Sequence, residues 1–254
     1  MSDAVRLDIT QHAAVLTLNA PETRNALSSS LLDGLHARLT DIEQQLASGT
    51  LDRHVLVLTG SGKAFCAGMD LKAVLADPTL IHTLLRLLAE ASLRIRALPM
   101  VTIAHLNGPA IGGGCGLAMV CDLVASAPNV RIGFPEVDLG ACPAVVAPWL
   151  VRKISAGNAR RVLLTGGTMT AREGHALGMV SHLLDDGDGD EQTLESIVAR
   201  LAGAGPTALA ATKRLLNDID GSLDREVAVR GAALSAEVFS GPEAQERIRA
   251  KFVK

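Results

Sequence analysis

The chain has 254 residues, of which 48% are hydrophobic, 20% are charged and only 2% are aromatic, and its formal net charge is −3. This length and apolar content predict a large aliphatic core, whereas the few aromatic side chains and the slight negative charge argue against binding to nucleic acid or to an anionic membrane. The sequence shows no apolar run of the roughly 18 residues that span a bilayer and no signal-peptide core. The four cysteines form no CxxC pair, so we expect a cytoplasmic protein with reduced thiols and no metal site.

The first two thirds of the chain alternate between strand-like and helix-like patterns. Strands are expected over 5–9, 14–18, 54–59, 101–106, 122–126 and 130–134, and helices over 28–47, after Asp70 and over 80–97. The run at 54–59 is apolar without interruption, which is typical of a strand buried on both faces. This alternation predicts an α/β fold.

The last third of the chain shows helical patterns alone. Helices are expected over 193–203, 206–217, 224–239 and 242–252. We therefore divide the chain into a core of residues 1–190 and a helical region of residues 191–254. The acidic segment 185–191 lacks the glycine and glutamate positions of an EF-hand, so we interpret it as a solvated linker and not as a calcium site.

Three consecutive glycines, Gly112 to Gly114, precede an apolar stretch that suits a helix. A glycine turn that opens a helix directs unpaired N–H groups and the positive end of the helix dipole to one place. Such a place can hold an anion or the charge that develops on a carbonyl oxygen. A tight turn with close backbone packing is the alternative interpretation.

Two further segments carry candidate chemistry. In residues 63–72, small residues lead to a helix start, so the N–H groups near Met69 and Asp70 either face a ligand or belong to an ordinary capped loop. Glu136 lies between apolar residues and a proline. A carboxylate that loses water there has a raised pKa and suits proton transfer near neutrality, although a surface or capping role is the alternative.

The order of the motifs resembles the enoyl-CoA hydratase/isomerase (crotonase) family. The motifs are Pro21-x-x-Arg24-Asn25-Ala26-Leu27, the segments 64–71 and 107–118, Cys121-Asp122-Leu123, and the segment 134–140. The resemblance is strong from about residue 10 to about residue 183 and weak in the helical tail. It implies a crotonase-like spiral of ββα units with a helical C-terminal region that forms trimers, often paired into hexamers. It also implies an acyl-CoA thioester as substrate, with coenzyme A as part of that substrate and no separate cofactor.

The resemblance also implies roles for individual residues. The N–H groups of Met69 and Gly113 would form an oxyanion hole for the thioester carbonyl, and Glu136 would be the catalytic acid–base. Adenine and pantetheine would lie along Ala64–Gly68 with Ala67 as a backbone contact, while Arg24 is either near the CoA phosphates or a plain surface arginine. The expected substrate-binding residues are Arg24, Ala64, Ala67, Gly68, Asp70, Leu71, Gly116, Pro143 and Ala144.

The chain departs from the family pattern at one position. Well-known hydratases of the family carry a first glutamate just after the glycine run, where this chain has Gly116. A lone Glu136 suffices to move a proton from C2 to C4 of a 3-enoyl thioester, which favours a double-bond isomerase. Residues 114–117 and 139–148 are instead similar to a bacterial subgroup of enoyl-CoA or methylglutaconyl-CoA hydratases. We expect a 2-enoyl-CoA hydratase, with a Δ3-Δ2-enoyl-CoA isomerase and a non-catalytic acyl-CoA binder as the alternatives.

Overall fold

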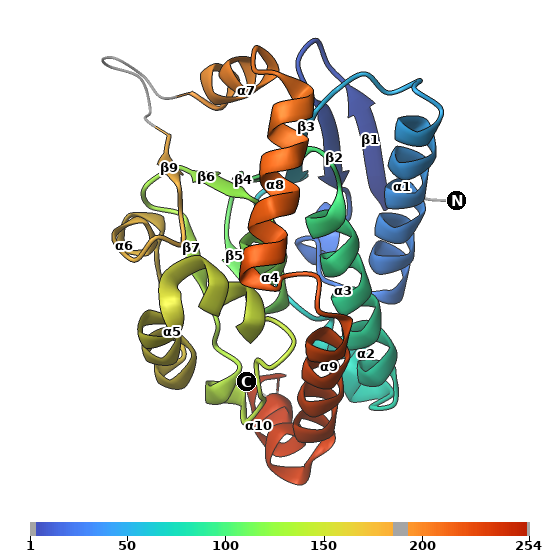
Figure 1. Ribbon diagram of the computed structural model, residues 1–254. Helices are drawn as coiled ribbons and strands as arrows, with labels where there is room; N and C mark the ends of the chain where they lie inside the picture. The colour runs from blue at the N-terminus through green and yellow to red at the C-terminus, as the bar shows by residue number, and fades with distance from the viewer. Residues whose placement is uncertain (1–3, 185–192, 253–254) are drawn as a thin grey trace.

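The structure is a computed structural model that describes residues 4–184 and 193–252. Within these residues a larger sheet has six strands in the order β1-β2-β3-β4-β6-β9, and a smaller sheet has three in the order β5-β7-β8 (Figure 1). The larger sheet consists of β1 (Val5–Ile9), β2 (Ala14–Leu18), β3 (Val55–Gly60), β4 (Val101–Leu106), β6 (Leu123–Ser126) and β9 (His182–Leu183). The smaller sheet consists of β5 (Ala110–Ile111), β7 (Arg131–Gly133) and β8 (Thr168–Thr170).

The helices cover both faces of the larger sheet. They are α1 (Ser29–Ala47), α2 (Leu71–Ala76), α3 (Leu80–Ala97), α4 (Gly113–Val120), α5 (Ala147–Thr165), α6 (Ala171–Ala176), α7 (Leu194–Ala202), α8 (Pro206–Asp220), α9 (Arg225–Ser240) and α10 (Pro242–Phe252). Short 3-10 turns occur at η1 (Pro21–Thr23) and η2 (Val137–Leu139). None of the described helices is both long enough and apolar enough to cross a bilayer.

Strand β3 shows how the apolar run at 54–59 is used. Its parallel neighbours are β2 and β4, and residues 55–58 are all buried. Alternate side chains of a strand point to opposite faces. Accordingly, Leu56 and Leu58 belong to the main core, whereas Val55 and Val57 belong to a second cluster that Ile197 of α7 covers.

The last two helices pack beside the middle of the chain. Helix α9 packs along α3, and α10 contacts α9, α2 and η2. Figure 1 shows α9 and α10 at the lower end of the molecule, next to α2. The C-terminal helices therefore reach the part of the core in which the candidate site lies.

Most of the predicted elements are confirmed. The predicted helix over 80–97 coincides with α3, and the other predicted helices and strands are present with small shifts at their ends. The sequence pattern did not predict α5, β5, β8 or β9, whereas the helix expected around His175 is present as α6. In α5 the helical pattern is interrupted by Ser155, which has φ of 70°.

Some sequence-based predictions fall outside the described part of the chain. Residues 1–3 and the acidic segment 185–191 are not described, so the interpretation of the latter as a linker stays a prediction. The division at residue 190 falls in the same stretch and also stays a prediction. Among residues 4–184 and 193–252, no group of three or more His, Cys, Asp or Glu side chains is arranged to hold a metal ion.

Candidate active site

The glycine run forms the turn between β5 and α4. Gly112 has φ of 55° and ψ of −127°, a conformation that glycine adopts without a steric penalty. Its N–H donates to the carbonyl of Gly133 at 2.8 Å, which ties the turn to β7. Gly113 is the first residue of α4, so its N–H has no acceptor within the helix. This geometry makes the Gly113 N–H a candidate donor to a ligand.

The glycines also allow close packing around this turn. A Cβ on Gly114 would lie 2.5 Å from the carbonyl oxygen of Cys66, and one on Gly113 would lie 3.0 Å from Cδ1 of Leu27. Both interpretations of the glycine run therefore apply, because the backbone is closely packed and the N–H of Gly113 begins a helix.

Met69 lies on a strand-like segment between two backbone partners. On one side, Leu27 donates to the carbonyl of Gly68 at 2.8 Å and accepts from the N–H of Asp70 at 3.4 Å. In a parallel bridge of this kind, the N–H of the residue between the two bonds points away from the partner. The N–H of Met69 therefore points away from Leu27. Three residues before Met69, Cys66 forms a parallel bridge with Ala110, just before the glycine run.

Glu136 follows β7 and directly precedes η2. A Cβ on Gly112 would lie 3.1 Å from Oε1 of Glu136, so the carboxylate lies against the glycine run. Its Oε2 is buried and has no hydrogen-bond partner among the described residues. Burial raises the pKa of Glu136 to about 7, its own backbone N–H opposes the rise, and the charge of Asp138 adds to it. A carboxyl group with this pKa can both accept and return a proton near neutral pH.

Two thiols lie close enough to Glu136 to interact with it electrostatically. Burial raises the pKa of both Cys115 and Cys142. These thiols are therefore protonated at neutral pH, when Glu136 is partly ionised. Glu136 is the stronger candidate for a base at this site.

The predicted CoA-binding segment is held by the backbone near Arg24. The N–H of exposed Ala67 donates to the carbonyl of Arg24 at 3.0 Å, and Arg24 itself has φ of 55° and an exposed side chain. Ala64 is buried, whereas Asp70 caps α2 by accepting the N–H of Ala73 at 3.1 Å. The role of Arg24 through its side chain stays a prediction, while its carbonyl holds the loop.

Asn25 helps to form the site, although the sequence pattern predicted no role for its side chain. Asn25 is fully buried, and its backbone has φ of 55°. Its Nδ2 donates to the carbonyls of Ser61 (3.0 Å), Ala64 (2.8 Å) and Phe65 (3.2 Å). Asn25 thus fixes the loop that leads to Met69. The feature of the sequence that could have indicated this role is an asparagine within a turn motif, because asparagine tolerates the left-handed backbone conformation.

The segment 141–146 meets α4 at Gly116, two residues after the glycine run. Pro143 is buried and Ala144 is half-buried, and Val146 packs directly against Gly116. Leu71 is also half-buried against the main core. The two segments that carry most of the predicted substrate-binding residues thus reach α4, with Cys66 against Gly114 and Val146 against Gly116.

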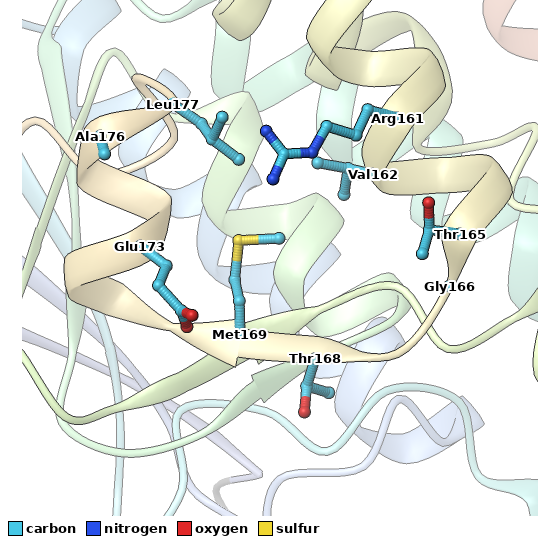
Figure 2. A pocket seen from close by; sticks show the side chains of 9 residues that line it. All are labelled: Arg161, Val162, Thr165, Gly166, Thr168, Met169, Glu173, Ala176 and Leu177. Atoms are coloured by element: carbon cyan, nitrogen blue, oxygen red, sulfur yellow. The ribbon is translucent and has the colours of Figure 1, made fainter.

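Several surface hollows are formed by residues other than Glu136. One of about 400 Å³ is lined by α5, β8 and α6, and Figure 2 shows Arg161 and Met169 directed into it with Glu173 at the side. Another, of about 550 Å³, lies between α5 and α9. At the candidate site itself, α10 packs on η2, because a Cβ on Gly140 would lie 3.1 Å from Cδ of Arg247. Helix α10 therefore lies close to Glu136, which directly precedes η2.

The family model for enoyl-CoA hydratase/isomerase matches residues 8–252. The chain belongs to the enoyl-CoA hydratase/isomerase family. A provisionally named enoyl-CoA hydratase of Thermus thermophilus is 38% identical over 250 residues, covering 96% of this chain and 95% of its own length. The 2,3-dehydroadipyl-CoA hydratase of Escherichia coli is 32% identical over 232 residues, covering 91% of this chain and 86% of its own.

The solved structures agree with this family assignment. The crystal structure of an enoyl-CoA hydratase from Mycobacterium avium superposes with a TM-score of 0.83 at 30% identity, covering 99% of this chain and 97% of the other. The predicted crotonase-like α/β fold is therefore confirmed, and the family match extends through the helical tail in which we found only a weak resemblance. The enzymes of this family act on acyl-CoA thioesters.

Proposed function

We propose that this protein is an enoyl-CoA hydratase that adds water across the C2=C3 double bond of a 2-enoyl-CoA thioester. The observation that carries the proposal is the buried carboxylate of Glu136, which lies against the glycine run and has a pKa of about 7. A base with this pKa stands beside the helix start whose N–H groups suit a developing oxyanion. Two relatives with hydratase names support hydration as the reaction.

In the proposed mechanism, the thioester carbonyl oxygen accepts hydrogen bonds from the N–H groups of Met69 and Gly113. Glu136 removes a proton from a water molecule, whose oxygen forms a bond to C3 while the π electrons move onto the carbonyl oxygen. The resulting enolate collapses, and Glu136 returns the proton to C2. Each donor that is fixed in advance at the oxyanion lowers the barrier by roughly 3–4 kcal/mol.

The CoA part of the substrate is proposed to lie along residues 64–68. The exposure of Ala67 supports this placement, because the pantetheine chain needs a solvent-accessible segment to lie along. Arg24 is next to this segment and is proposed to approach the CoA phosphates. On the far side of α4, Pro143 and Ala144 are proposed to contact the acyl end, with Leu71 and Asp70 closing the near side.

Isomerisation of a 3-enoyl-CoA is a second candidate, and one specific observation favours it. The position of the first family glutamate is Gly116, and the space beside it is occupied by Val146. A carboxylate that acts alone is sufficient to carry a proton between C2 and C4. Product analysis separates the two reactions, because only hydration gives a 3-hydroxyacyl-CoA.

The first test is the Glu136→Gln variant, assayed by the loss of the ultraviolet absorbance of the enoyl thioester. We expect hydration to fall by at least about 100-fold, since general acid–base groups contribute roughly that much or more. Unchanged turnover in this variant would reject the mechanism. Formation of 2-enoyl-CoA from 3-enoyl-CoA with no 3-hydroxy product would select the isomerase. Tight binding of the thioester without exchange of solvent deuterium into C2 would select a non-catalytic acyl-CoA binder.

The proposal extends to assembly and location. Exposed apolar side chains on α8 and α9 supply a surface for contact between copies of the chain, and we place the trimer, or a hexamer of two trimers, there. All four cysteines lie in the described residues and are free thiols, which supports a reducing compartment such as the cytoplasm.

A further inference from the structure

Gly116 and Val146 interlock in a way that leaves no room for a side chain at residue 116. A Cβ on Gly116 would lie 2.1 Å from Cγ1 and 2.7 Å from Cβ of Val146. Real Cβ atoms do not approach other heavy atoms this closely. The valine side chain therefore occupies the space into which a side chain at residue 116 would point.

Val146 is not free to move out of this space. Its side chain is only 2% exposed, and it directly precedes α5. The neighbouring residues are tied to α9, because Ser235 Oγ donates to the carbonyl of Cys142 at 2.8 Å and accepts from the N–H of Val145 at 3.0 Å. The carbonyl of Ala144 packs so closely on Gly231 that a Cβ there would lie 2.6 Å away. The segment that carries Val146 is thus fixed from behind.

This pair lies next to the proposed catalytic carboxylate. Gly116 is one helical turn along α4 from Gly112, to which it donates a hydrogen bond of 2.9 Å, and Gly112 lies against Glu136. The other ionisable groups that interact with Glu136 are the protonated thiols of Cys115 and Cys142 and the carboxylate of Asp138. The wall formed by Gly116 and Val146 is hydrocarbon, so it neither ionises nor binds water through a side chain.

We propose that Val146 packs as the matched partner of Gly116 and thereby determines which reaction this site catalyses. Its side chain fills the place of a second carboxylate, so that Glu136 carries every proton transfer. The inference rests on the proposed acyl-CoA chemistry of the site. It predicts that a second carboxylate is tolerated at residue 116 only when residue 146 is made smaller.

The packing half of the proposal is tested with alanine variants and thermal unfolding. Glycine to alanine in a helix interior is normally neutral or stabilising, and Gly34→Ala in α1 is the matched control, because its Cβ would meet Val5 at an ordinary 3.4 Å. We expect Gly116→Ala to lower the Tm by about 5 °C or more through overpacking, and Gly34→Ala not to lower it. In Gly116→Ala/Val146→Ala, the loss should be smaller than the sum of the two single losses. A Gly116→Ala protein as stable as the Gly34→Ala protein, or strictly additive losses, would overturn the pairing.

The catalytic half compares Gly116→Glu/Val146→Ala with Gly116→Gln/Val146→Ala. The two differ only in a carboxylate against an amide, so both have the same size and the same cavity. We expect the glutamate variant to hydrate 2-enoyl-CoA at least about 10-fold faster than the glutamine variant, with the pH profile showing a second ionisable group. Equal rates in two folded proteins would overturn the inference.

The inference about Val146 and the proposed hydratase function can fail independently of each other. If the wild-type protein isomerises 3-enoyl-CoA and does not hydrate 2-enoyl-CoA, the hydratase proposal fails. The Tm changes of the alanine variants and the rate difference between the glutamate and glutamine variants still test the pairing of Gly116 with Val146. If the glutamate variant does not fold, the alanine set decides the question by the additivity of the Tm changes.

Discussion

At the scale of single residues, the burial of Glu136 connects catalysis to stability. The carboxyl group is placed where an ionised form is poorly solvated, and this is why its pKa rises from 4.5 to about 7. The same desolvation that makes Glu136 a useful acid–base near neutrality makes its ionised form costly to the fold. The residue therefore has opposite pH dependences in activity and in stability.

We predict that the wild-type protein loses stability relative to Glu136→Gln as the pH rises through the range from 4.5 to about 7. The folded state holds the proton more tightly than the unfolded state, so this contribution is fully present below the unfolded pKa and is lost as the pH passes the folded pKa. The loss amounts to about 3 kcal/mol at most. Denaturation of both proteins across this range measures it, while hydration by the wild type should rise with pH through the same pKa. Stability curves that stay parallel at all pH values would contradict the buried carboxylate.

Gly116, Asn25 and Glu136 also mark the limit of what the sequence predicts at this scale. The motif around Glu136 is local, so its proline and apolar neighbours were enough to suggest a desolvated carboxylate. The partner of Gly116 is Val146, 30 residues further along the chain, and nothing in either segment identifies the other. Asn25 likewise acts on carbonyls at residues 61–65, which only the fold brings within reach.

At the scale of elements, the predicted helices and strands succeed where one face is regularly apolar. Helix α3 has buried side chains at Ile81, Leu84, Leu85 and Leu88, and this spacing is visible in the sequence. Strands β5 and β9 have two residues each, which is too short for a periodic pattern in the sequence. They form because a neighbouring strand pairs with them. The two hydrogen bonds by which Ser235 of α9 holds Cys142 and Val145 are equally non-local, although α9 itself was predicted.

We predict that Ser235→Ala loosens the attachment of residues 142–145 to α9 and lowers both stability and turnover. The variant leaves the buried N–H of Val145 and the carbonyl of Cys142 without their side-chain partner, at a cost of about 2 kcal/mol. This corresponds to a Tm lower by about 5 °C for a chain of this size. Ser240→Ala, at an exposed position on the same helix, is the control: it removes only an exposed 3.5 Å contact with His82 and should change both quantities far less. A Ser235→Ala protein with the wild-type Tm would show that the two hydrogen bonds do not hold the segment.

At the scale of the whole molecule, α8 is oriented with its polar side inward. Lys213 and Asn217 are buried at 7% and 4% exposure, with Lys213 Nζ donating to the carbonyl of Met100 at 2.8 Å. The opposite side carries Leu215, Leu216 and Ile219, which are 58%, 54% and 73% exposed. A surface helix of a monomer normally shows the reverse pattern, and a contiguous exposed apolar face marks a contact with another protein surface. The orientation of α8 therefore supports assembly of several copies through this face.

We predict that the protein sediments and scatters light as a species of about three or six times its 26.4 kDa chain mass. Ile219→Glu places a charge in the middle of the apolar face, and burial of that charge against a second copy is unfavourable. The variant should therefore shift the mass toward a single chain, whereas Ile219→Leu keeps the face apolar and should keep the assembly. Because Ile219 is 73% exposed in the single chain, the glutamate should leave the circular dichroism of the monomer unchanged. A wild-type protein that is monomeric, or an Ile219→Glu protein with unaltered mass, would contradict assembly through α8, and the inward polar side of this helix would then serve the fold of one chain alone.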